Sequence, residues 1–158
     1  RCPWRCARAM LASMETGGRQ RGPMWFRIAA LVLVAWGAMG VWACYTQLTQ
    51  GADAMGPASD YDRALFARLP GWYRLDYAVA TVAMLLGACA LLLRSRHAAA
   101  LLTVSLVAVM IQFGWMFLMT DIIAVKGPYV LYFPLLILTV GALALQLAHV
   151  ARRRGWIV

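Results

Sequence analysis

The sequence predicts an all-α integral membrane protein, a four-helix bundle with its N-terminus and C-terminus both in the cytoplasm. Three observations predict this fold. Hydrophobic residues make up 63% of the chain and charged residues only 13%, whereas about a quarter of the residues in a soluble domain are charged. The charges lie in clusters, and four long apolar stretches separate the clusters. Most positive charges of the membrane part flank these stretches, as expected for anchors at a membrane surface.

The four apolar stretches are each close to the length that crosses a membrane. About 20 residues are needed to span a hydrocarbon core some 30 Å thick. A backbone in lipid must satisfy its own hydrogen bonds, so we expect each span to be helical. The expected spans cover residues 26–46, 75–93, 98–120 and 128–149. They form a single membrane domain over residues 24–158.

Residues 1–23 show a different pattern. This segment is rich in arginine and has no sustained apolar period. Met24 stands a few residues ahead of the first apolar stretch, as a natural translation start would. We therefore expect residues 1–23 to be a disordered tail or an upstream extension that takes no part in the fold.

The connections between spans set the expected orientation. Basic clusters lie before the first span, between the second and third, and after the fourth: Arg27, residues 94–97 and residues 152–154. The other two connections carry at least as many acidic as basic residues. Lysine and arginine prefer the cytoplasmic side, so both ends of the chain and the short 94–97 turn are expected inside. Aromatic residues, among them Tyr73 and Tyr77, are expected at the outer boundary.

The first outer loop is expected to contain a short helix over residues 60–69, lying on the membrane surface. Ser59 and Asp62 form a capping-box pattern, and apolar residues then recur at helical spacing. Pro70 and Gly71 end this helix and turn the chain into the second span.

Details within the spans predict how the helices pack. Small residues four apart allow helix backbones to approach each other closely. They occur as Gly40 and Cys44, Ala83 and Gly87, and Ala144 and Ala148. Pro134 lies inside the fourth span, where a missing N–H group is expected to kink the helix.

Gln112 and Ser105 are candidate substrate-binding residues. Gln112 lies near the middle of the third span, and Ser105, seven residues earlier, shares its face of the helix. A polar side chain at this depth points into the bundle. There it either bonds to another helix or lines a cavity that binds a substrate, and both interpretations remain open.

Asp76 and Asp121 are the second pair of candidate substrate-binding residues. They border the outer ends of spans two and three, which a short hairpin makes neighbours. Two carboxylates at a shared cavity mouth could bind a proton or a cation. The alternative is that both are interfacial caps, with Arg74 and Lys126 as their partners.

The sequence predicts no enzyme, no cofactor and no metal site. It lacks the HExxH, GxSxG and phosphate-loop motifs. Its four cysteines lack the spacing of a metal site: Cys2, Cys6, Cys44 and Cys89. The net charge of +9 is placed for contact with a lipid bilayer, and no basic face for nucleic acid is available.

From Met24 onward the chain resembles a group of small four-span bacterial inner-membrane proteins of unknown function. The similarity lies in residues 25–29 (WFRIA), in residues 69–73 (LPGWY) and in residues 91–96 (LLLRSR), ahead of an apolar span that contains Gln112. The resemblance implies a location in the bacterial inner membrane. Members of the group are often labelled sugar transporters, although this sequence lacks the Pro-Gln motif of three-span sugar-transporter half-units.

Two functions are therefore expected. The first is a non-enzymatic inner-membrane protein with a structural or accessory role, working beside a membrane partner. The second is a carrier of a small solute, such as a sugar, which at four spans would act as a homodimer to enclose a path around Gln112. A cavity at Gln112 would favour the carrier, and a closed core would favour the structural role.

Overall fold

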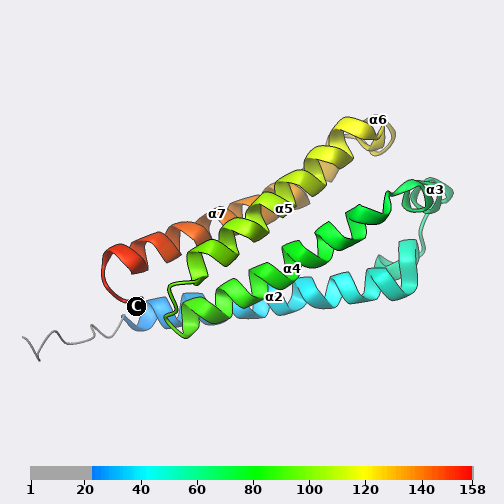
Figure 1. The fold of residues 1–158 in the computed structure, drawn as a ribbon. Coiled ribbons are helices and arrows are strands. Elements are labelled where there is room, and N and C mark those ends of the chain that lie inside the picture. The colour runs from blue at the N-terminus through cyan, green and yellow to red at the C-terminus, as the bar shows by residue number, and fades with distance from the viewer. Residues whose placement is uncertain (1–22, 158) are drawn as a thin grey trace, which may run out of the picture.

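The computed structural model describes residues 23–157. Four long helices run alternately up and down along one axis (Figure 1): α2 (Met24–Gln50), α4 (Gly71–Leu92), α5 (Ala98–Met119) and α7 (Tyr132–Arg153). Short helices connect them at one end: η1 (Gly51–Met55), α3 (Asp60–Arg68), α6 (Ile122–Lys126) and η2 (Pro128–Leu131). Between residues 23 and 157 there is no strand.

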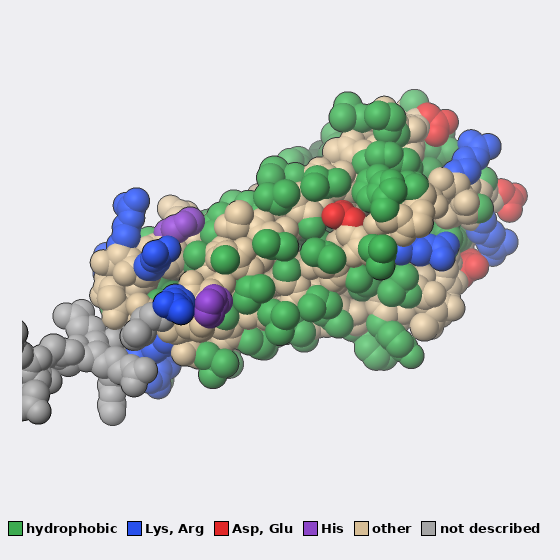
Figure 2. All heavy atoms as spheres, in the orientation of Figure 1, with side chains coloured by type: hydrophobic (Ala, Val, Ile, Leu, Met, Phe, Trp, Pro, Cys, Tyr) green, Lys and Arg blue, Asp and Glu red, His purple; other side chains and the backbone are tan. Residues whose placement is uncertain are grey.

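The four predicted spans are confirmed as four helices that are long and apolar enough to cross a membrane. Large hydrophobic side chains are exposed along their length. Lysine and arginine side chains gather at the two ends of the elongated molecule (Figure 2). Such a surface is stable against lipid and not against water. The chain is therefore a multi-pass membrane protein.

The helix bounds differ from the expected ones for local reasons. Helix α2 continues to Gln50 and α4 begins at Gly71, because a helix can extend beyond the apolar core into the headgroup region. Pro134 does not interrupt a helix. It is the third residue of α7, where the N–H group that proline lacks would have no partner within the helix.

The two ends of the bundle are built differently. At one end, which we call the turn end, residues 93–97 join α4 to α5, and both ends of the described chain lie there (Figure 1). Arg94 ends α4 with a positive φ of 59°, and the N–H group of Ser95 bonds to the carbonyl of Ala90 at 2.8 Å. This is the Schellman arrangement that stops helices. The opposite end, with α3 and α6, is the loop end.

At the turn end the four helices close on a shared core. Ala30, Ala144 and Ala148 are fully buried there. Beyond α7, Gly155 adopts a left-handed φ of 66° and turns the chain back. The ring of Trp156 then lies 5.5 Å from the ring of Phe26 at the start of α2. The two ends of the described chain are thus packed against each other.

Helices α2 and α4 cross most closely at Gly37. A Cβ atom added there would lie 2.8 Å from the Cα atom of Leu85. At Gly40 an added Cβ would lie 3.6 Å from the side chain of Thr81, which is an ordinary contact. Gly37, and not the expected Gly40, is therefore the glycine that the close approach requires.

We expect Gly37→Ala to destabilise the protein by about 1–3 kcal/mol, the usual cost of overpacking a close contact. The matched control is Gly40→Ala, which adds the same methyl group one turn away. Alanine favours a helix over glycine by about 1 kcal/mol, so this variant should melt at or above the parent temperature. Thermal melting of both variants in one detergent tests the difference. Equal melting temperatures would contradict the close crossing at Gly37.

Candidate functional site

The four long helices surround a cavity of about 410 Å³ in the half of the bundle nearer the loop end. On α5 its lining runs from Ser105 to Met116, and on α2 from Trp36 to Gln47. Helices α4 and α7 complete the wall. Towards the turn end the cavity stops at Met84, which belongs to the closed core.

The cavity exists because the helices diverge. The pair α2–α4 and the pair α5–α7 lie together at the turn end and separate towards the loop end (Figure 1). Near the turn end small residues allow contact: a Cβ atom on Gly87 would lie 2.8 Å from the side chain of Leu102. In the other half, large side chains such as Trp36 and Phe113 face the interior. Small residues let backbones approach, and large ones hold them apart.

Gln112 lines the cavity and is 7% exposed. The phenol group of Tyr73, on the neighbouring helix α4, lies beside the Gln112 amide. The same phenol hydroxyl lies 3.9 Å from the sulfur atom of Met116. Gln112 therefore contacts a neighbouring helix and at the same time presents its amide to a cavity.

Ser105 also lines the cavity, but its hydroxyl is already engaged. It donates a hydrogen bond to the carbonyl oxygen of Ala80 at 2.7 Å, which joins α5 to α4. The hydroxyl of Thr81 donates to the carbonyl of Tyr77 in its own helix at 3.0 Å. Across residues 23–157 no side-chain hydrogen bond is formed by Gln47 or by the Tyr77 hydroxyl, both in the cavity wall. Few polar side chains of the cavity wall therefore lack a hydrogen-bond partner within the protein.

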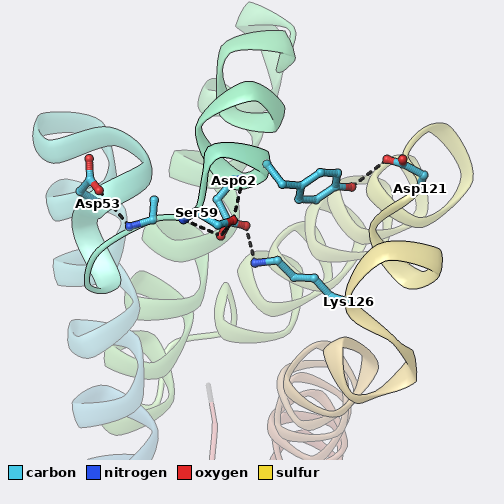
Figure 3. A network of polar contacts seen from close by, with 7 residues as sticks. Asp53, Ser59, Asp62, Asp121 and Lys126 are labelled. Atoms are coloured by element: carbon cyan, nitrogen blue, oxygen red, sulfur yellow. Dashed lines mark hydrogen bonds and ion pairs between the residues drawn. The ribbon is translucent and has the colours of Figure 1, made fainter.

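The structure does not bring Asp76 and Asp121 into the cavity. Asp121 accepts a hydrogen bond from the hydroxyl of Tyr61 at 2.7 Å (Figure 3). One oxygen of Asp76, Oδ2, is buried and has no hydrogen-bond partner in the described part of the chain. Neither residue lines the cavity around Gln112. Of the four candidates, the structure brings together Gln112 and Ser105.

The cavity wall contains neither charged side chains nor a group of residues that could hold a metal ion. The residues that line the cavity include no aspartate, glutamate, lysine, arginine or histidine. Within residues 23–157 no group of three or more histidine, cysteine, aspartate or glutamate residues could hold a metal ion. The chemistry available in the cavity is therefore apolar contact and hydrogen bonding by neutral groups.

Sequence reasoning missed Tyr73 and Tyr77 as cavity residues. Both were expected at the membrane boundary, but Tyr73 is only 5% exposed and both line the cavity. A usable signal was present, because Tyr73, Tyr77, Ala80 and Met84 recur at a helical spacing of three to four. That spacing places all four side chains on one face of α4.

A polar network joins the two loops at the loop end (Figure 3). Lys126 of α6 pairs with Asp62 of α3, and Tyr61 of α3 bonds to Asp121. Asp62 also completes the predicted capping box with Ser59, whose hydroxyl accepts a hydrogen bond from the Asp62 N–H group at 3.2 Å. The helix predicted after Ser59 is thus confirmed, and it is tied to α6.

This network lies over the loop end of the cavity. A second hollow of about 420 Å³ is lined by Asp62 and Lys126. It shares Gln47, Leu69 and Met116 with the main cavity. The α3–α6 contacts therefore cover the route from the loop end to Gln112.

The network is sensitive to acid. The Lys126 ammonium group, and then the Ser59 hydroxyl, hold the pKa of Asp62 below its usual value. Asp62 therefore stabilises the folded loop end above about pH 4, the usual pKa of an aspartate. That contribution is lost as the pH falls through the lower pKa of the folded state. The pKa of Asp53 is also lowered, chiefly by the N–H group of Ala58.

We expect Lys126→Met to loosen α3 while leaving the capping box intact. The Lys126 and Asp62 side chains are 28% and 29% exposed, and partly exposed pairs contribute less than about 1 kcal/mol. Amide hydrogen exchange over residues 60–68 should become faster at pH 7. In the parent the same loosening should appear only below about pH 4.

Arg63→Met is the matched control for this measurement. Arg63 pairs with Asp53 inside the same loop at 3.1 Å and does not bond to α6. Its loss should leave the contact between α3 and α6 in place. Unchanged exchange in Lys126→Met would contradict the role of the Lys126–Asp62 pair.

Comparison with protein-family models, with curated proteins and with solved structures found no match. The similarity to small four-span inner-membrane proteins therefore remains a resemblance. The function has to be inferred from the geometry of the cavity and from the placement of charge.

Proposed function

We propose that this chain is a non-enzymatic protein of the bacterial inner membrane that binds and carries a small uncharged molecule. The cavity around Gln112 is the observation that supports the proposal. Its volume of about 410 Å³ falls in the range of small-molecule sites, about 300–1,000 Å³. Its wall is mostly apolar with a few polar groups, which is also typical of such sites.

The polar groups of the wall favour a ligand with few hydroxyls over a sugar. A buried polar group without a hydrogen-bond partner costs about 1–3 kcal/mol, so a sugar requires many partners. The hydroxyls of Ser105 and Thr81 are already engaged. The Gln112 amide, which also lies beside the Tyr73 phenol, and the side chains of Gln47 and Tyr77 can still bond to a ligand. A small solute with one or two polar groups fits this supply better.

We further propose that the turn end faces the cytoplasm. The turn end carries Arg94, Arg96 and residues 152–154, whereas the loop end carries four of the five aspartates of the described chain. Positive residues prefer the cytoplasmic side. In this orientation the cavity lies in the outer half of the membrane, and α3 lies at the outer surface.

An accessory role beside a membrane partner is the second candidate. Helix α7 favours it, because α7 packs mainly against α5. Its outward face carries Leu135, Leu136 and Leu143, each about half exposed. This face could pack against another membrane protein or a second copy of the chain, with the cavity left empty.

A panel of uncharged ligands, read by thermal melting of the purified protein, tests the proposal. A ligand at 100 times its Kd stabilises the native state by about 2.7 kcal/mol. We expect at least one compound to raise the melting temperature of the parent, and Gln112→Leu to reduce that rise. Thr103→Val is the control, since the Thr103 hydroxyl is exposed and bonds only to Ala99. If no compound shifts the parent, the accessory role is favoured.

A further inference from the structure

We propose that the ligand is a lipid-like amphiphile with one hydrocarbon chain and an uncharged head. It enters sideways from the bilayer, through an opening between α2 and α7. This inference rests on the proposed function and specifies its substrate class and its route of entry.

The cavity is open on the side between α2 and α7. The main helix contacts in the bundle are α2 with α4, α4 with α5, and α5 with α7, and α4 also touches α7. The first and last helices share a core cluster only at the turn end, through residues such as Ala30 and Ala148. Farther along, Met39 of α2 and Phe133 of α7 line the cavity and are 55% and 57% exposed. These two residues form the edges of the opening.

The surroundings of this opening are hydrocarbon. Met39 and Phe133 lie in helices that span the membrane, so the opening faces lipid tails. By contrast, the route from the loop end passes beneath α3, where Lys126 is bonded to Asp62. A molecule already dissolved in the bilayer therefore has the less obstructed path to Gln112.

The polar and apolar groups of the cavity wall lie in the same order as the head and tail of a lipid in that half of the membrane. The groups that can bond a head group, on Gln47, Tyr77 and Gln112, lie in the part nearer the loop end. The deeper part is lined by apolar residues such as Trp36 and Met84. A lipid in this half has its head at the loop end and its tail towards the middle. It could enter without turning over.

The wall also limits the charge of the head group. None of the lining residues is charged, and a buried charge without a partner is strongly disfavoured. A phosphate or carboxylate head would therefore be excluded. A hydroxyl or ester head can bond to the Gln112 amide, and the hydrocarbon chain can fill the apolar depth.

Photocrosslinking in lipid nanodiscs tests this inference on the full chain. The probe is a monoacylglycerol with a diazirine in its acyl chain, and the comparison probe is a diazirine-bearing hexose. Labelled peptides are mapped by mass spectrometry. We expect the monoacylglycerol probe to label the cavity faces of α2 and α7 saturably, and unlabelled monoacylglycerol to compete. Labelling of the lipid-facing surface should not saturate.

Two matched variants locate the site. Gly40→Leu adds a side chain in the cavity wall, where an alanine-sized group meets only Thr81 at 3.6 Å. Ala38→Leu places the same residue, leucine, on the exposed face of α2. Saturable labelling should fall at least tenfold in Gly40→Leu and stay unchanged in Ala38→Leu. Equal loss in both, with melting temperatures unchanged, would overturn the assignment.

The other outcomes of the experiment show whether only the amphiphile proposal fails or whether the proposed binding function fails as well. If only the hexose labels the cavity saturably, the amphiphile is wrong and the cavity still binds a ligand. If neither probe labels it saturably, the inference fails, and the ligand panel decides whether binding of any kind remains. Crosslinks between two copies across α2 and α7 would show that a second chain covers the opening, which also overturns lateral entry.

Discussion

The hydrocarbon core of a membrane offers no water to a polar backbone, and this constraint governs the rest of the structure. Every N–H and C=O group at that depth must be bonded within a helix, so the irregular backbone lies at the ends of the bundle. Lipid tails also remove the hydrophobic drive for helices to associate. Cohesion must come from close packing at residues such as Gly37 and Gly87 and from bonds such as that between Ser105 and Ala80.

The distribution of these contacts divides the molecule into a closed half and a hollow half. Small buried residues and the packing of Trp156 on Phe26 close the turn end. At the loop end the helix pairs separate, and a polar network between α3 and α6 spans the gap. A closed half and a hollow half in one bundle would allow the proposed ligand to be held at Gln112 without a continuous path through the membrane.

Much of this arrangement could be predicted from the sequence, because membrane spans depend on local composition. The four charge-free stretches predicted the four helices, and the seven-residue spacing predicted a shared face for Ser105 and Gln112, which both line one cavity. Contacts between distant segments could not be predicted. Lys126 meets Asp62 across 64 positions, and no local pattern marks that pair. The choice between Gly37 and Gly40 depends on where two helices cross, which spacing alone does not determine.

We propose that lipid surrounds the four spans, with the loop end outside and the turn end inside. Cysteine labelling by a membrane-impermeant maleimide in spheroplasts tests it most directly, in a variant whose native cysteines are alanine. We expect Asp60→Cys in α3 to be labelled in intact spheroplasts, and His97→Cys in the short turn only after permeabilisation. Labelling of His97→Cys in intact spheroplasts, or of both positions equally, would contradict the account.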